Sequence, residues 1–341
     1  MPQQNSNRAI AIWLLVVAAL IFSMVILGGV TRLTRSGLSM VEWAPIMGTV
    51  PPLSQAQWQE TFDKYKQFPE YKKINRELNV EEFKSIFWFE YSHRMLGRII
   101  GLAFLVPFLV FLARRKIKKS DTPKFIIMFV LGGLQGLLGW YMVKSGLVSK
   151  PHVSQYRLTA HLIAAIAIYG YILWVAWGLL LPRLVQNSAS LQKVRRFGLA
   201  LTALILIMIL SGGFVAGTKA GLAYNTFPTM NGYWIPEGLY ALKPWWINWF
   251  ENITTIQFNH RLIAWLLMAC VPAFWFYTTR IVQDPLTRIG LHLLLAMLAI
   301  QFTLGITTLL FAVPVALGAA HQAGALVLLT IALFVNRRLA G

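Results

Sequence analysis

Four of the six histidines, His93, His161, His260 and His321, occur in two matching pairs. His93 and His260 stand in the segments "EYSHRMLGR" and "QFNHRLIAW", and His161 and His321 stand in "TAHLIAA" and "AAHQAGA". Neutral imidazole is a common axial ligand of haem iron, and a haem between two helices takes one histidine from each. The pattern therefore favours two bis-histidine haem sites, formed by His93 with His161 and by His260 with His321.

Other uses of histidine explain this pattern less well. A single histidine in an apolar helix is most often a hydrogen-bonded structural residue, but that does not account for four at matching positions. Zinc prefers three or four ligands, and neither a cysteine nor a further carboxylate is repeated to complete such a set. A proton relay has no need of a duplicate. His152, which we expect to be exposed to solvent, and His292 have no counterpart and are assigned no role.

The two halves differ at the position three residues before the first histidine of each pair. Glu90 precedes His93, whereas Gln257 precedes His260. An ionisable residue at the threshold of a membrane helix is costly and is functional by default. Glu90 also continues the apolar stripe predicted for residues 79–90, so it should face the protein interior. A carboxylate there can accept a proton or stabilise positive charge, which makes Glu90 the candidate catalytic residue. The alternative is a structural role, as a helix cap or as a partner of the arginine that follows His93.

Basic residues lie close to the same histidines in the sequence. The guanidinium group is well suited to forked contacts with a carboxylate, such as a haem propionate. Lipid headgroups would be equally good partners. The candidate propionate contacts are Arg32, Arg35, Arg94, Arg157 and Arg261.

The elements that must position these residues are membrane helices. Of the 341 residues, 57% are hydrophobic and only 13% are charged, which is about half the charged fraction of a soluble domain. The apolar residues form blocks long enough to cross a bilayer, which takes about 20 residues per helix. The sequence therefore predicts an all-α polytopic membrane protein with eight spans, at residues 9–30, 93–113, 124–143, 158–181, 197–216, 260–279, 287–311 and 315–335.

The net charge of +19 is explained by topology. Lys and Arg are concentrated in both terminal segments and in the connections at 113–124 and 182–196, which share one side if the spans alternate. The outer segment 31–92 has no net charge. The positive-inside rule then places both termini in the cytoplasm, with span one retained as an anchor. We expect the chain to lie in the inner membrane of a bacterial cell. The partners implied are membrane lipids, and no nucleic acid is needed.

The chain resembles itself in two halves. "LGGVTRLTRSGLS" after span one matches "SGGFVAGTKAGLA" after span five, and "QGLLGW" in span three matches "QFTLGI" in span seven. Parallel duplication about an axis along the membrane normal is an established membrane-protein plan. We therefore expect two pseudo-symmetric four-helix bundles, residues 1–190 and 191–341, the first carrying the outer insert 31–92. Within the insert, capping-box spacings at Ser54 and Asn79 predict two helices.

These segments together resemble the haem A synthase family. The resemblance covers nearly the whole chain and rests on "GGVTRLTRSGLSMVEWAPIMGTVPPL", "FEYSHRMLGRIIG" and "NHRLIAW". It implies oxidation of a methyl group of haem O to a formyl group by successive hydroxylations, giving haem A for cytochrome oxidase. His260 and His321 would hold a haem b cofactor, His93 and His161 would hold the substrate haem, and Glu90 would be catalytic.

The resemblance also implies candidate partners, namely haem O synthase and cytochrome oxidase assembly factors, and leaves the oligomeric state open. One departure is that some bacterial members carry a cysteine pair in an outer loop. The lone Cys270 lies within span six, so that electron route is absent here.

Two other classes of function compete with this interpretation. A transporter would also use a repeat, but it has no need of two iron ligands in each half. A dihaem b-type cytochrome that carries electrons from quinol would have the same four ligands. Such a carrier could keep both pockets alike, so the difference between Glu90 and Gln257 favours the enzyme.

Overall fold

The protein is described by a computed structural model that covers residues 2–41, 47–146, 153–181 and 188–340. These residues form helices and loops, with no strand among them. Eight helices are long and apolar enough to cross a membrane, so the all-α, multi-pass prediction is confirmed. They are α1 (Pro2–Leu33), α4 (Val80–Ala113), α5 (Thr122–Gly146), α6 (Gln155–Leu180), α7 (Ala189–Thr218), α9 (Ile253–Ile281), α10 (Pro285–Leu310) and α11 (Val315–Leu339).

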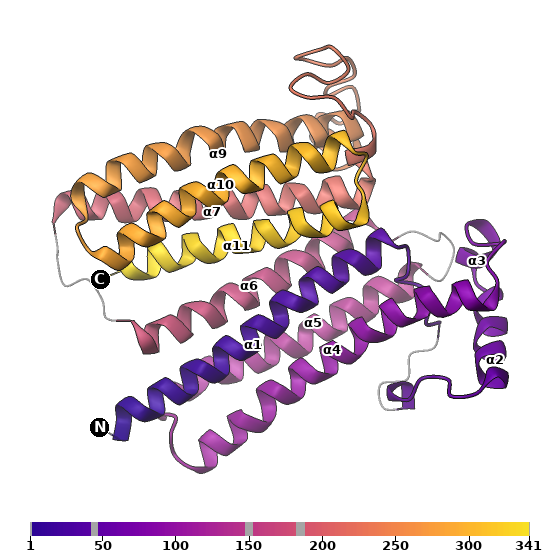
Figure 1. Cartoon of the computed structure of the whole chain (residues 1–341), viewed down its shortest axis with the longest axis horizontal. Coiled ribbons are helices and arrows are strands. Elements are labelled where there is room, and N and C mark those ends of the chain that lie inside the picture. The colour runs from indigo at the N-terminus through magenta and orange to yellow at the C-terminus, as the bar shows by residue number, and fades with distance from the viewer. Residues whose placement is uncertain (1, 42–46, 147–152, 182–187, 341) are drawn as a thin grey trace.

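The helices have the same neighbours in the two halves of the chain (Figure 1). In the first half α1 and α5 each pack against both α4 and α6, and in the second half α7 and α10 each pack against both α9 and α11. Each half is therefore a ring of four helices, with α4 diagonal to α6 and α9 diagonal to α11. The halves meet through α1, α6, α7 and α11.

Polar side chains as well as apolar packing join the two halves. Gln322 of α11 donates from Nε2 to the carbonyl of Val25 in α1 at 2.7 Å, and the hydroxyls of Tyr169 and Thr330 are 2.8 Å apart. A side chain at Gly29 would collide with the amide of Gln322, so the glycine allows this close approach. Small residues and interhelical hydrogen bonds are the usual means of holding membrane helices together.

Span two is longer than predicted, because the amphipathic outer segment and the membrane segment form one helix, α4, of 34 residues. Asn79 and Glu82 make the predicted capping box at its start. The predicted helix after Ser54 is α2 (Gln55–Lys66), which also has its capping box. A short helix that was not predicted, α3 (Pro69–Lys73), joins the two.

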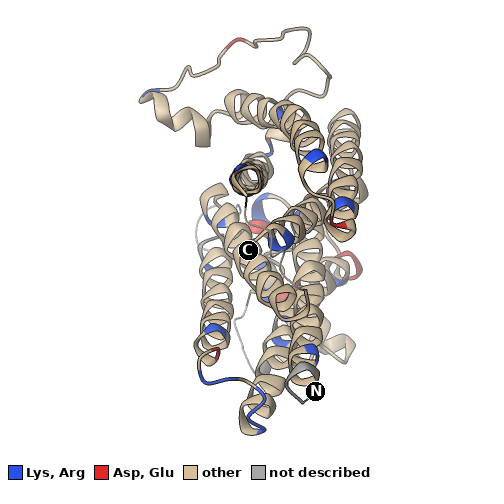
Figure 2. Cartoon of the chain, turned by 90° about the vertical axis from the view of Figure 1, so that its left-hand side faces the viewer, with Lys and Arg blue, Asp and Glu red and all other residues tan. Residues whose placement is uncertain are grey.

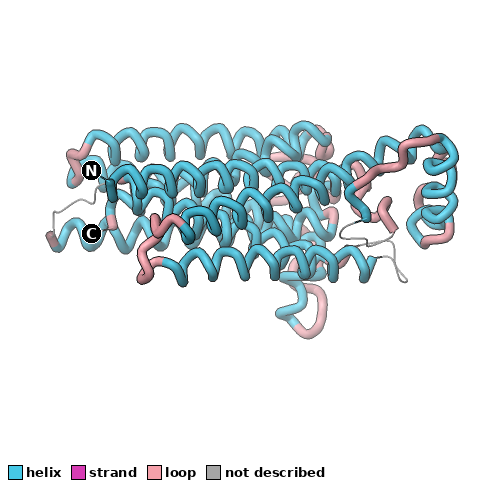
Figure 3. The backbone as a smooth tube through the Cα atoms, turned by 90° about the horizontal axis from the view of Figure 1, so that it is seen from below, coloured by secondary structure: helices cyan, strands magenta, loops and turns pink. Residues whose placement is uncertain are grey.

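The outer insert has a small aromatic core of its own. Phe83 and Phe87 of α4 pack against three buried aromatic residues of α2, Trp58, Phe62 and Tyr65. Figure 3 shows that α2 and α3 lie against the end of α4 that projects beyond the bundle. Because this cluster fixes the orientation of α4, it also fixes the direction of Glu90, which follows Phe87 by three residues.

The described ends of the chain lie at the same end of the bundle, opposite the insert (Figure 1). Figure 2 looks onto this end and shows Lys and Arg in the connection between α4 and α5. The long loop between α7 and α9 emerges at the other end. It contains the short helices η2 (Ala220–Leu222), η3 (Trp245–Ile247) and α8 (Asn248–Glu251), and a short 3-10 turn, η1 (Met47–Thr49), lies in the insert.

Candidate haem sites

The predicted histidine pairs come together in the structure. His93 of α4 lies close enough to His161 of α6 for a charge on one imidazole to act on the other. The same holds for His260 of α9 and His321 of α11. All four side chains are partly buried. Each pair thus belongs to the two diagonal helices of one ring, which is the arrangement needed to present one imidazole to each face of a flat ligand. His292 lies apart from both pairs, with its Nδ1 accepting from Trp275 Nε1 at 3.0 Å, and His152 falls outside the described residues.

Every one of these imidazoles rests against a glycine on a neighbouring helix. A Cβ placed on Gly28 would lie 3.0 Å from His93 Nε2, and one on Gly212 would lie 3.4 Å from His260 Cε1. On Gly139 and Gly305 it would lie 3.0 Å from Cε1 of His161 and of His321. The four glycines stand at matching positions of the repeat. Each glycine leaves open the space beside its imidazole, and a larger residue at that position would fill this space.

Two glutamines hold the second histidine of each pair. Gln135 Nε2 lies 3.1 Å from His161 Nδ1 and donates to the carbonyl of His161 at 2.9 Å. Gln301 makes the same two contacts with His321, at 3.1 and 3.0 Å. Gly324 makes room for the Gln301 amide, since a Cβ there would collide with its oxygen. Each glutamine therefore holds its histidine at Nδ1 and at the backbone carbonyl. The amide nitrogen donates in this arrangement, so Nδ1 accepts; with the amide turned over, Oε1 would accept the Nδ1 proton and leave Nε2 for another ligand.

These residues fit haem better than a small metal ion. Within the described part of the chain, no group of three or more His, Cys, Asp or Glu side chains could hold an ion. Two imidazoles on diagonal helices, each beside a glycine, match bis-histidine ligation of haem iron, and Nδ1 is also engaged in three of the four rings.

Glu90 is buried and fully engaged. Its side chain is 3% exposed, and Oε1 accepts from Arg94 Nε at 3.1 Å and from Arg94 Nη2 at 2.5 Å. Oε2 accepts from Ser39 Oγ and from the backbone N–H of Met40, both at 2.8 Å. The predicted inward direction is confirmed, and the partner that the structural alternative required, Arg94, is present as well. Glu90 thus connects α4 to the segment that follows α1.

The corresponding residue in the second half also binds the loop, but it donates a hydrogen bond to the loop backbone where Glu90 accepts one. Gln257 is 2% exposed and donates from Nε2 to the carbonyl of Tyr224 at 3.2 Å. Tyr224 corresponds to Met40 in the repeat, whose N–H donates to Glu90. The two sites therefore share a backbone arrangement, but only the first has a carboxylate at this position.

The five arginines fall into three groups. Arg94 donates to the carbonyl of Met40 at 2.8 Å, and Arg261 donates to that of Tyr224 at 2.9 Å, so both hold the loop after the first helix of their half. Arg157 lies over the ring of Tyr141, 4.7 Å from its centroid. Arg32 and Arg35 lie at and just beyond the end of α1. A propionate contact stays a prediction for all five.

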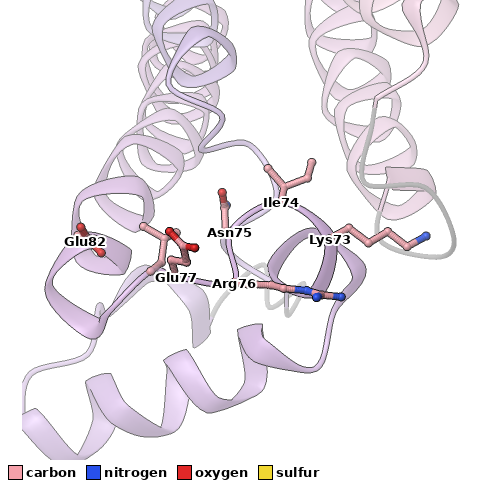
Figure 4. Close-up of a pocket in the computed structure, with 7 residues that line it drawn as sticks. Lys73, Ile74, Asn75, Arg76, Glu77 and Glu82 are labelled. Carbon is pink, nitrogen blue, oxygen red and sulfur yellow. The ribbon is translucent and has the colours of Figure 1, made fainter.

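A pocket of about 470 Å³ opens beside α3 and the start of α4 (Figure 4). It is lined mainly by polar and charged residues, including Asn75, Arg76 and Glu77. None of the histidines or arginines above lines it. The pocket is therefore separate from both candidate haem sites.

A second buried acid, Glu70 of α3, lies near the first candidate site. Its side chain is 5% exposed, and Oε2 has no hydrogen-bond partner among the described residues. Burial, assisted by the charge of Glu90 and opposed by that of Arg35, raises the pKa of Glu70 from its ordinary value of 4.5 to about 8. Glu70 is therefore mostly neutral at pH 7.

This shift predicts that the outer insert loses stability as the pH rises. The folded insert binds the Glu70 proton more tightly than the unfolded chain does, so the stabilisation is complete below pH 4.5 and is lost as the pH passes about 8. We expect protease cleavage within residues 54–79 to increase between pH 6 and pH 9, a range of about three pH units that includes the shifted pKa. The increase should be smaller in Glu70→Gln. Glu77→Gln, at an exposed acid, should behave like the parent. Equal pH dependence in all three proteins would contradict the assignment.

Known proteins that are similar to this chain match it over nearly its whole length. The family model described as "Cytochrome oxidase assembly protein" matches residues 11–333. A heme A synthase of Nitrosospira multiformis is 58% identical, over 99% of this chain and 97% of its own. One of Nitrosomonas eutropha is 53% identical, over 98% and 95%. The heme A synthase COX15 of Bos taurus is 44% identical, over 99% and 84%.

Proposed function

The chain belongs to the cytochrome oxidase assembly protein family that includes the heme A synthases, and we propose that it oxidises a methyl group of haem O to a formyl group, giving haem A. The observation that carries the proposal is the pair of equivalent histidine sites of which only one contains an acid. Identity above 50% to two bacterial heme A synthases supports it. The protein is an oxidoreductase of the membrane that acts on haem.

We assign the substrate to the N-terminal site and a resident cofactor to the C-terminal site. His93 and His161 would ligate the substrate haem O, and His260 and His321 would ligate haem b. A bound haem b would supply one-electron chemistry. The assignment is supported by Glu90, because the reacting methyl group needs an ionisable neighbour that the cofactor does not.

Glu90 is placed to move a proton or to offset positive charge. Its Oε2 accepts from the Ser39 hydroxyl, whose proton is exchangeable, while Arg94 holds Oε1. The carboxylate is thereby fixed in direction with one oxygen towards a proton donor. Such fixed groups are most effective in a site that excludes water, because charge stabilisation there needs no rearrangement.

The function is tested by the haems that the protein contains and makes. The purified protein should yield haem b together with haem O or haem A on extraction and chromatography. Reconstituted with haem O, a reductant and oxygen, it should form haem A. Haem b alone, with no haem A formed, would favour the dihaem b-type electron carrier instead.

We propose further that the protein lies in the inner membrane of a bacterial cell, with both termini in the cytoplasm. Support comes from the basic residues at the end of the bundle where the termini lie. A periplasm-dependent reporter fused to the C-terminus should be inactive, and activity would contradict this orientation. Haem O synthase and cytochrome oxidase assembly factors are the proposed partners, since they supply the substrate and use the product.

A further inference from the structure

One of the four histidines differs from the others in what its Nδ1 contacts. His161 and His321 each have a glutamine amide at 3.1 Å, and His260 has the hydroxyl of Ser211 at 3.1 Å. Among the described residues, no hydrogen bond to the His93 side chain is found. Three of the four imidazoles are thus anchored from behind, and the exception belongs to the N-terminal site.

The cause of this difference is a single position of the repeat. Ser211 opens the segment "SGGFVAGTKAGLA", and Leu27 opens its counterpart "LGGVTRLTRSGLS". The next residues, Gly212 and Gly28, each lie against the corresponding histidine ring. The same turn of α1 and of α7 therefore faces the histidine. A hydroxyl is present at this turn in one half, and an aliphatic side chain is present in the other.

The contact has a direct consequence for iron ligation. A partner that accepts the Nδ1 proton fixes the tautomer, holds the ring in one orientation and makes Nε2 more basic. Ser211 can accept in this way, so His260 is prepared for iron. His93 has no such partner and can rotate at lower cost. Loss of a partner of this kind typically weakens metal binding about 10–100-fold.

We propose that the Leu27/Ser211 difference makes the N-terminal site the one that exchanges its haem and the C-terminal site the one that retains it. Ser211 is a positioning residue acting through His260. In the N-terminal site, His161 remains anchored by Gln135 while His93 is the ligand that releases first. The inference rests on the proposed function for the identity of the two haems, but the difference in release does not depend on it.

The test exchanges the two residues and measures how quickly haem leaves. Each full-length protein, loaded with haem and held in detergent, is mixed with excess apomyoglobin, and the haems remaining are identified by extraction. In Ser211→Ala, the C-terminal haem should leave about 10–100-fold faster. In Leu27→Ser, the N-terminal haem should leave more slowly by a comparable factor. Ser211→Thr keeps the hydroxyl and should restore slow release.

A purely structural effect is separated by the reduction potential. Removing the hydrogen bond makes the imidazole less basic, so the C-terminal haem of Ser211→Ala should have a higher potential, and that of Ser211→Thr should not. Ser23→Ala is the matched control, because Ser23 donates only to the carbonyl of Ala19 in its own helix. Unchanged release and potential in Ser211→Ala would overturn the inference. Haem b found in both sites would overturn the proposed function while leaving the difference in release measurable.

Discussion

Glu90→Gln is expected to abolish haem A formation while the protein still folds and binds both haems. Glutamine has nearly the size of glutamate and can still accept from Arg94, but it can neither take a proton nor carry a charge. Gln257 shows that an amide is accommodated at the equivalent position of the second half, where it is 2% exposed. The loss of activity should therefore arise from the missing carboxylate and not from a missing side chain.

The energetic cost of this change decides which controls are needed. Arg94 is 10% exposed, and leaving a buried charge without its partner costs about 3–5 kcal/mol. Arg94 would keep its hydrogen bond to the Met40 carbonyl, so we expect less than this. Haem content and thermal stability should be measured beside activity. Ser39→Ala removes one hydrogen bond to Glu90 but leaves the carboxylate, and it should keep haem A formation within about tenfold, the factor given by about 1.4 kcal/mol.

Two outcomes have clear meanings. Haem A formation near the normal rate in Glu90→Gln would refute the catalytic role and leave Glu90 as the anchor between α4 and the segment after α1. Loss of activity in Ser39→Ala as complete as in Glu90→Gln would show that the Ser39 hydroxyl is as necessary as the carboxylate and would assign the proton path of Glu90 to it.

The fold could be predicted because its information is local. Eight apolar blocks are visible in any window of about 20 residues, and the capping boxes at Ser54 and Asn79 are four-residue signals. The continuous helix α4 was not predicted, because the change from an amphipathic to an apolar pattern near Glu90 resembles a boundary. The packing of Phe83 and Phe87 on α2 supports the outer half of this helix without interrupting it.

The site could be predicted only as far as the repeat identified it. The histidine pairs and Glu90 stood out because a residue type was either repeated or replaced. Gln135 and Gln301 were visible in "QGLLGW" and "QFTLGI", yet their role depends on which helix lies beside α6 and α11. Sequence spacing carries no such information.

The contacts of the arginines could not be predicted from sequence spacing either. Arg94 and Arg261 were named as candidate propionate contacts because of their type and place, with lipid headgroups as the alternative, and this stays a prediction. In the structure each donates to a loop carbonyl at 2.8 or 2.9 Å. The position of a loop backbone follows from the whole fold, so a forked donor close to it cannot be assigned from the sequence alone.

His260→Ala and His321→Ala should each remove the haem b of the C-terminal site. The two imidazoles are the only side chains predicted to bind its iron, and each is already held through Nδ1, by Ser211 and Gln301. Losing a ligand should weaken binding by more than the roughly 10–100-fold expected for losing a partner behind it. The absorption bands of low-spin bis-histidine haem should therefore disappear or shift in both variants, and extracted haem b should fall.

Two further substitutions show whether this effect belongs to the site. His292→Ala removes a histidine that accepts a hydrogen bond from Trp275 away from both pairs, and its haem b content should match that of the parent. His93→Ala should lose the N-terminal haem and keep haem b, because the two rings of helices hold their ligands separately. An unchanged haem b spectrum in both His260→Ala and His321→Ala would disprove the ligand assignment. Loss of haem b in His93→Ala alone would mean that the cofactor and substrate sites are the reverse of those proposed.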